Sequence, residues 1–415
     1  MKSKIALLLS TASLLHAGSP DLETSLVAPK AESWIKPLIN IRARYEFADI
    51  DGFDQSNAFT VRERLGLKTQ SWNGFSVLVE GEFTQAVVDE YNGGAIGADP
   101  YNPTDSIIAD PETNELNQFY LQYTGWDTTA IVGRQTLVYD NAAFIGDVAW
   151  RQNEQTFDGI TLSNTSIEKL TLKYAYINRV NRIFGSDADG DIKLTPNVES
   201  VDGQVNLFNA SYAGFEGVTL GAYAYVMSFD DLPVWDNNTF GLSAKGKALD
   251  LDLYGEGAFQ DQAGLSTDET AGYAHVTVTK AFGTQSLMLG MEWLGAGFKT
   301  PLATVHAFNG YSDVTDPARI SGAHNGLTDT YAAYSLPIFY GIKWVNIFHI
   351  LGDDSISAGY GWEYDTVLSK KFDDNFTALA KLAFFESGDD AYTGGSKGIA
   401  LPTAQRISVE LTYTF

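Results

Sequence analysis

The chain has 415 residues, no cysteine and a formal net charge of −25 at pH 7. The lack of cysteine excludes a disulfide framework, thiolate metal sites and a cysteine nucleophile. The acidic balance argues against nucleic acid as a partner, because nucleic-acid phosphates would be repelled.

The N-terminus has the three parts of a secretory signal peptide. Lys2 and Lys4 form a short basic region, residues 5–15 are apolar, and small residues follow at Ala17 to Ser19. We therefore expect a signal peptide over residues 1–19, a short periplasmic leader over 20–37, and one domain over 38–415. A buried N-terminal helix is the alternative.

No later segment has the roughly 18 uninterrupted apolar residues that a spanning helix needs. Instead, apolar and polar residues alternate with a period of two, which is the period of a β-strand. The alternation is found in residues 39–47, 75–83, 170–176, 251–260, 376–384 and 406–415. In a lipid-embedded barrel the apolar set faces lipid and the polar set faces the lumen. The pattern predicts an all-β fold, a transmembrane antiparallel β-barrel.

The last of these segments ends in an aromatic residue, Phe415. This ending resembles the assembly signal of bacterial outer-membrane barrels. We therefore expect the cell outer membrane as the location, its lipid as a partner, and the barrel-assembly machinery as a second partner through Phe415. A soluble β-sandwich or β-helix is the alternative, although charged residues on so many strands would make a dry core unfavourable.

Short turn signals alternate with long polar segments along the chain. Short turns are predicted at 72–74, 215–217 and 373–375, and long segments at 89–115, 184–203, 299–329 and 388–404. The spacing predicts about 18 strands, with 16 as the alternative, joined by short periplasmic turns and long extracellular loops. Glu63 falls on an apolar face, so we expect it near the membrane interface or covered by another segment.

Signals for catalysis or for a cofactor are weak. His275, His306, His324 and His349 show no HExxH spacing, which argues against a zinc hydrolase. A serine hydrolase using His306 or His324 is left open, although no GxSxG motif supports it. We expect no cofactor and no enzymatic activity.

One loop contains three alternating carboxylates, Asp187, Asp189 and Asp191. They are weak candidates for Ca²⁺ binding because they lack the spacing of the twelve-residue calcium loop. A solvated acidic turn is the alternative.

Arginines are concentrated in the first half of the chain. Arg42, Arg44, Arg62 and Arg64 alternate with apolar residues, so we expect them to line the lumen of adjacent strands. Guanidinium groups bind carboxylates bidentately and would favour anionic solutes. The alternative is a self-neutralised ladder in which Glu46, Glu80 and Glu82 pair with these arginines.

Several motifs resemble those of the alginate-export family of outer-membrane barrels. They are GRQ at 133–135, WRQNEQTFDG at 150–159, HAFNGYSD at 306–313, and GWEYD at 361–365 followed by LSKKF at 368–372. The resemblance covers residues from about 38 to the C-terminus. It implies an 18-stranded monomeric barrel with an arginine-containing lumen, and it adds Arg134, Arg151 and Asp158 to the candidate pore-lining or substrate residues. Salt bridges between strands are the other role that these three residues would fill.

These observations predict an outer-membrane channel that passes hydrophilic solutes through a polar lumen. Anionic sugars, oligosaccharides or a polysaccharide are the expected solute class. An outer-membrane barrel hydrolase and a structural or adhesive barrel remain the alternatives.

Overall fold

The computed structural model describes residues 33–190, 197–261, 270–323, 325–356, 359–388 and 401–415. The expected signal peptide and most of the expected leader lie outside these residues, as do Asp191 and His324. The first strand begins at Ile35, three residues before the predicted start of the barrel.

The described part of the chain forms one antiparallel sheet of 18 strands, which confirms the predicted fold class. The strands are β1 (Ile35–Ile50), β2 (Ser56–Thr69), β3 (Phe75–Glu90), β4 (Thr113–Gly125), β5 (Thr128–Gln135), β6 (Thr156–Asn164), β7 (Leu170–Asn181), β8 (Ser200–Phe215), β9 (Val218–Phe229), β10 (Asn237–Ala248), β11 (Leu251–Asp261), β12 (Thr270–Phe282), β13 (Gln285–Leu294), β14 (Leu327–Pro337), β15 (Lys343–Gly352), β16 (Gly359–Lys371), β17 (Phe376–Ser387) and β18 (Ala404–Thr414). Short helical elements are α1 (Asp316–Ser321), η2 (Pro233–Trp235) and η3 (Phe339–Gly341). No helix among the described residues is long and apolar enough to cross a membrane.

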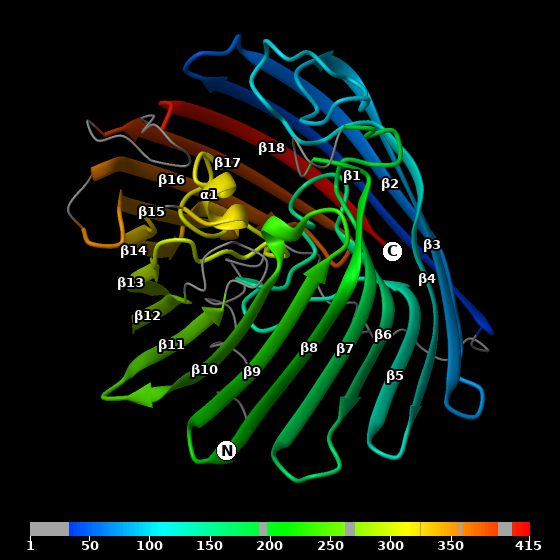
Figure 1. Ribbon diagram of the computed structural model, residues 1–415. Coiled ribbons are helices and arrows are strands. Elements are labelled where there is room, and N and C mark those ends of the chain that lie inside the picture. Colours follow the sequence, from blue (N-terminus) through cyan, green and yellow to red (C-terminus); the bar gives the residue numbers. More distant parts are fainter. Residues whose placement is uncertain (1–32, 191–196, 262–269, 324, 357–358, 389–400) are drawn as a thin grey trace.

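The first and last strands close the sheet into a barrel (Figure 1). Ala43 of β1 lies opposite Val61 of β2 on one side and opposite Leu411 of β18 on the other. Each remaining strand pairs with its neighbours in the chain. The ring therefore has no free sheet edge, which is the condition for a sheet to lie in lipid.

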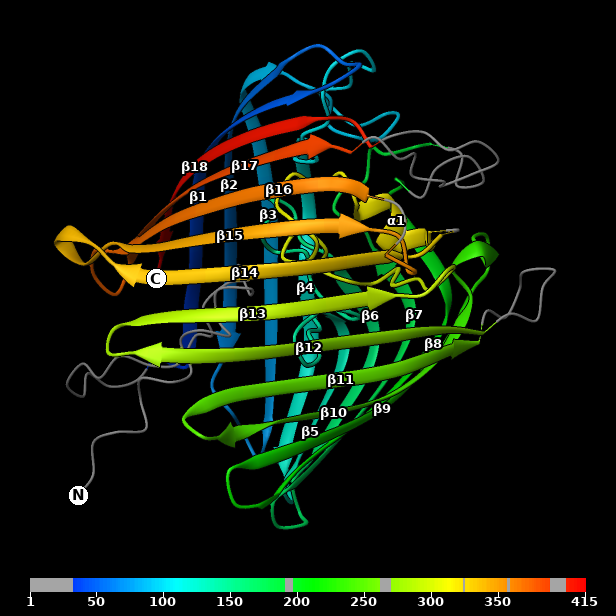
Figure 2. The ribbon, with the colours of Figure 1, turned by 90° about the vertical axis from the view of Figure 1, so that its left-hand side faces the viewer.

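Connections alternate between the two ends of the barrel (Figure 2). The predicted short turns join β2 to β3, β8 to β9 and β16 to β17, and the C-terminus lies at the same end. In the first of these turns Asn73 and Gly74 both have positive φ, 50° and 89°. We call this the short-turn end. The predicted long segments lie at the opposite, long-loop end, so this part of the layout is confirmed.

The outer face of the barrel is apolar. Val409, Leu411 and Phe415 are 51%, 47% and 56% exposed, so the apolar set of the last strand points outward as predicted. Exposed aromatic residues also gather near the short-turn end: Trp72, Trp126, Phe215, Phe282, Phe339, Tyr340 and Phe372. An apolar band bordered by aromatic residues is the exterior of a lipid-facing barrel.

Glu63 departs from both expectations that the sequence raised. It lies in the middle of β2 and is exposed, with Ile41 and Phe83 opposite it on the neighbouring strands. It is therefore neither at a strand end nor covered by another segment of the described chain.

The inner face is not polar throughout, which corrects the sequence prediction. On β7, β8 and β9 most of the inward residues are apolar and almost fully buried, among them Ala175, Ile177, Val205, Leu207, Tyr225 and Met227. Segments from the long-loop end fold into the barrel and cover this wall. Phe144, from one of them, has its ring 5.4 Å from that of Tyr223 and 5.0 Å from that of Tyr273. These strands therefore face a hydrophobic interior instead of water.

The apolar exterior leads to a stability prediction. Leu289 is 55% exposed in the middle of β13, whereas Phe282, 54% exposed, ends β12 at the short-turn end. In lipid vesicles, Leu289→Arg should lower the free energy of unfolding by about 2–4 kcal/mol and Phe282→Arg by about 0–1 kcal/mol. Urea unfolding followed by tryptophan fluorescence measures both. Equal losses for the two variants would contradict a membrane position of this face.

Candidate functional site

Two segments from the long-loop end fold into the barrel and meet inside it (Figure 1). The first inner segment is residues 136–155, between β5 and β6. The second is residues 295–323 and 325–326, between β13 and β14, and includes α1. The backbone amide of Gly146 donates to Leu302 O at 2.8 Å, and the indole Nε1 of Trp150 donates to Thr304 O at 2.8 Å. The two segments thus form a joint obstruction across the lumen.

The four alternating arginines hold the first inner segment against the wall. They lie on the inner faces of β1 and β2 and are at most 6% exposed, with Arg42 directly opposite Arg62. Arg42 Nη1 donates to Ala149 O and to Arg151 O, both at 3.0 Å, and Arg44 Nη1 donates to Trp150 O at 2.6 Å. The carbonyl groups of a loop without regular structure are satisfied in this way by the wall.

Two of these four guanidinium groups also have close carboxylate partners. Arg44 Nη2 is 2.5 Å from Glu46 Oε2. Arg64 pairs with Glu82 and, at 2.7 Å, with Glu154 of the first inner segment. Charge compensation by neighbouring glutamates, which the sequence left open, thus applies to Arg44 and Arg64.

Arg62 differs from its neighbours. It is 0% exposed, it donates to Asn40 Oδ1, and its Nε has no hydrogen-bond partner. Among the described residues no carboxylate lies within 4.0 Å of it. Arg42 is almost as poorly compensated, since its nearest carboxylate, that of Glu410, is 3.9 Å away. Arg42 and Arg62 therefore have the weakest direct charge compensation of the four arginines.

Arg151 ties the first inner segment to the wall and to the second segment. It is 2% exposed, and it lies 3.1 Å from Glu46 Oε2 and 3.0 Å from Asp313 Oδ2. Arg406 of β18 reaches the same glutamate at 3.1 Å and donates to Ser312 O at 2.7 Å. Glu46 is thus shared by three arginines, Arg44 among them.

His306 connects the second inner segment to the first inner segment and to the wall strand β17. Its ring stacks on Trp150 with centroids 3.6 Å apart and an angle of 9°. Nδ1 lies 2.7 Å from Asp313 Oδ1, and Nε2 lies 2.9 Å from Nζ of Lys381 on β17. Burial, reinforced by the charge of Lys381, lowers the pKa of His306 to about 3. The neutral ring therefore donates from Nδ1 to Asp313 and accepts from Lys381 at Nε2. We call these contacts the histidine latch.

Arg134 and Asp158 do not line the lumen, which corrects the expectation for this pair. They lie opposite each other on β5 and β6, two residues along each strand from Val132 and Ile160, which are 48% and 45% exposed on the outer face. Arg134 donates from Nε and Nη2 to the two carboxylate oxygens at 2.8 and 3.0 Å. A salt bridge between strands was the alternative role predicted for this pair, and it is the role that the structure shows.

The structure also shows where most of the candidate metal-binding aspartates and histidines lie. Among the described residues no group of three or more His, Asp or Glu side chains is arranged to hold a metal ion. Asp187 and Asp189 belong to the connection between β7 and β8, while Asp191 lies outside the described residues. His275 and His349 lie on the inner faces of β12 and β15.

Sequence reasoning missed several charged residues of the interior. Lys381 and Arg406 occupy polar positions of predicted alternating strands, so their inward direction was visible but their partners were not. Arg319 of α1 gave no signal, because it lies in an irregular segment. Its Nη1 and Nη2 are 2.8 and 3.0 Å from the carboxylate of Glu292 on β13.

Comparison with known proteins adds support for the architecture. No protein-family model and no curated protein sequence matches this chain. Its fold is similar to the crystal structure of Acinetobacter baumannii OccAB4, with a TM-score of 0.69 and 13% identity over 94% of this chain and 100% of that one. It is also similar to Pseudomonas aeruginosa OpdQ, with a TM-score of 0.67 and 14% identity over 92% and 99% of the two chains. At these identities the likeness concerns the barrel fold, and the alginate-export resemblance rests on the sequence motifs alone.

The histidine latch predicts a response to pH. A histidine released to water has an ordinary pKa of about 6.5, whereas the latched ring has a pKa of about 3. The latch is therefore fully stabilised above about pH 6.5 and loses stability as the pH falls toward about 3, because protons bind only the released ring. The pKa of buried Asp313 is lowered as well, by the hydrogen bond from His306 and by the nearby arginines. Protonation of the Asp313 carboxylate at low pH therefore also weakens the latch.

Hydrogen exchange of residues 300–313, corrected for the intrinsic pH dependence of exchange, measures the latch. Between about pH 7.5 and pH 4.5 the wild type should lose protection in this segment. His306→Phe, which keeps a ring on Trp150 but does not titrate, should show a much weaker dependence. The same loss in both proteins would contradict the role given to His306.

Proposed function

We propose that the protein is an outer-membrane channel through which small hydrophilic solutes diffuse. The observation that carries the proposal is a closed barrel whose outer face is apolar and exposed while its inner wall bears arginines, lysine and carboxylates. Lipid around such a ring leaves its interior as the polar route across the membrane. The exposed aromatic residues at the short-turn end also support a barrel that crosses the bilayer, with this end at one membrane interface.

Anionic solutes are the preferred class within this proposal. Arg62 and Arg42 are buried side by side with few compensating carboxylates, and the ligands that hold Arg42 are backbone carbonyl oxygens. A solute carboxylate presents oxygens of the same kind with a full negative charge, so it competes favourably for the guanidinium groups. Arg42 and Arg62 are the residues that we assign to direct contact with the solute, while Arg44, Arg64 and Arg151 beside them keep their carboxylate partners.

The two inner segments restrict the size of the solute. They meet through backbone hydrogen bonds and through the Arg151–Asp313 pair at 3.0 Å, so the described conformation favours mono- or oligosaccharide acids over a polymer. Passage of a polysaccharide such as alginate requires both segments to move aside. The motifs shared with the alginate-export family support uronate-type solutes as the first to test.

Assembly and the alternative functions follow from the same contacts. Phe415 closes the seam, with its backbone N–H and C=O paired to Ile39 at 2.8 and 3.1 Å and its side chain exposed, a position open to the barrel-assembly machinery. In a hydrolase, His306 would face a serine, but both of its ring nitrogens are engaged by Asp313 and Lys381. In an adhesive barrel the long segments would point outward, whereas two of them fold inward.

Ion selectivity in planar bilayers tests the proposal. The wild type should conduct with a preference for anions, and Arg62→Gln should reduce the anion-to-cation permeability ratio roughly threefold, about 0.65 kcal/mol. Arg179→Gln is the matched control, because Arg179 pairs with Asp202 on the outer face at 2.6 Å and its removal changes the net charge equally. This control should leave the ratio unchanged.

Two outcomes would overturn the proposal. An absence of conductance at any voltage contradicts a channel. A cation preference that persists after Glu46, Glu80 and Glu82 are replaced by glutamine contradicts the anion preference while leaving the channel intact.

A further inference from the structure

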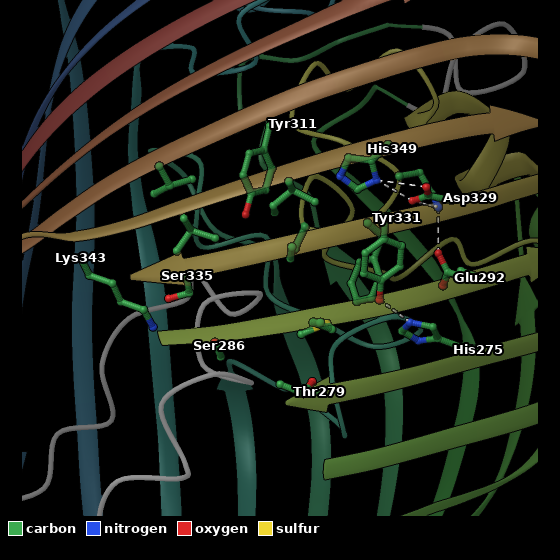
Figure 3. A pocket seen from close by; sticks show the side chains of 18 residues that line it. His275, Thr279, Ser286, Glu292, Tyr311, Asp329, Tyr331, Ser335, Lys343 and His349 are labelled. Carbon is green, nitrogen blue, oxygen red and sulfur yellow. Dashed lines mark hydrogen bonds and ion pairs between the residues drawn. The ribbon is translucent and has the colours of Figure 1, made fainter. Parts of the chain in front are cut away.

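A hollow lies in the lumen wall away from the arginines. It is formed by the inner faces of β12 to β16 and is covered by residues 307–311 of the second inner segment (Figure 3). Its enclosed part has a volume of about 60 Å³, and the space in front of it is open.

The long walls of the hollow are apolar. Met288, Ala333, Val345, Ile347 and Val367 line it from β13 to β16, together with Tyr331. Gly290 makes room for the tyrosine, because a Cβ at this position would lie 2.1 Å from the ring of Tyr331. Such walls bind an apolar body by removing it and themselves from water.

The side of the hollow away from the second inner segment lies toward the short-turn end. Ser286, Ser335 and Lys343 lie at one side of the hollow, and each is at or near the short-turn end of its strand. The residues at the opposite side, Glu292 and Asp329, lie beside the second inner segment. A solute in the hollow would therefore enter from the short-turn side.

The carboxylates at the inner side already have partners. Glu292 binds Arg319 at 2.8 Å and accepts from Asn309 at 2.9 Å, while Asp329 lies 2.9 Å from Nδ1 of His349. An anionic solute would be repelled by these two groups, and a cationic one would compete with Arg319 and His349 for them. The inner side of the hollow therefore offers no unpaired charge to a solute, and the positive charge of Lys343 lies at its other side.

One ring nitrogen of His275, in the wall of the hollow, has no hydrogen-bond partner. Its Nε2 lies 2.9 Å from the hydroxyl of Tyr331, whereas Nδ1 is buried without a partner, and the residue is 4% exposed. A buried imidazole nitrogen without a partner costs free energy that a ligand hydroxyl group recovers.

We propose that this hollow binds an uncharged solute with an aromatic ring and a hydroxyl group. The ring packs between Met288, Ile347 and Tyr331, and the hydroxyl group meets Nδ1 of His275. The solute class differs from the anions assigned to the arginine wall, so the site goes beyond the proposed function and depends on it only in that the lumen gives access.

Binding is measured without any current, by ¹⁹F line broadening of 4-fluorobenzyl alcohol on the purified full chain in detergent. Ala333→Phe fills the hollow from the inside and should weaken the binding at least about tenfold. Ala332→Phe is the matched control, because Ala332 lies opposite Leu289 and Phe348 on the apolar outer face. It should bind as the wild type does, and binding that is equal in all three proteins would overturn the site.

Related probes test the solute class. 4-Fluorobenzoate and 4-fluorobenzylammonium should bind at least about tenfold more weakly than the alcohol, and a fluorinated glucose should not bind measurably. His275→Leu should weaken the binding of 4-fluorobenzyl alcohol but not the binding of 4-fluorotoluene. Equal or tighter binding of either ion, or of the sugar, contradicts the assignment. Binding that is sensitive to Ala333→Phe in a protein without conductance would leave the site standing and remove the channel.

Discussion

The pairing of every strand into a closed ring is the constraint on which the rest of the structure depends. A β-strand in lipid must find partners for its backbone N–H and C=O groups within the sheet, because no water is there to replace them. The seam between β1 and β18 meets this demand at the two ends of the chain, up to Phe415. Once the ring is closed, alternation divides each strand between an outer face and an inner one. The composition of each face follows from what it touches.

The inner face is shaped by the two inner segments more than by water. Buried charges are unfavourable unless they are paired and hydrogen-bonded, and the interior provides such pairing around Glu46, which three arginines share. On the opposite wall the segments present Phe144 and its neighbours, so β7 to β9 carry apolar residues inward. One side of the lumen is thus held by ion pairs and the other by hydrophobic packing. The incompletely compensated Arg62 lies on the first side, and the hollow beside Tyr331 lies on the wall of β12 to β16.

The sequence was sufficient to predict what depends on local alternation and turn residues. It predicted the barrel, the strand number, the positions of long and short connections and the inward direction of Arg42 to Arg64. The motif resemblance placed Arg134 in the lumen, and alternation could not correct this, because β5 has only eight residues, TTAIVGRQ, in which threonine occupies both faces and glycine precedes the arginine. The period-two signal has no readable phase in such a strand. The arginine–aspartate pair was nevertheless foreseen as an alternative role.

Contacts between distant segments could not be read from the sequence. His306 and Lys381 are 75 residues apart, and Arg42 meets the carbonyl of Ala149 across 107 residues. Nothing in the local pattern of residues 136–155 indicates that they fold into the lumen, and the apolar inward residues of β7 to β9 are explained only once that packing is known. The hollow likewise depends on residues 307–311, which cover five strands that come before and after them in the chain.

The division of alternate residues between lipid and lumen is tested most directly on β18. Because the chain has no cysteine, single cysteines at residues 406–413 can be spin-labelled in an otherwise unaltered protein in lipid vesicles. The accessibility to oxygen, which dissolves in lipid, should be high at Ile407, Val409, Leu411 and Tyr413 and low at Arg406, Ser408, Glu410 and Thr412. The accessibility to a water-soluble nickel chelate should be low at the first four of these positions. Accessibility without a period of two, or high nickel accessibility at Val409 and Leu411, would contradict the account.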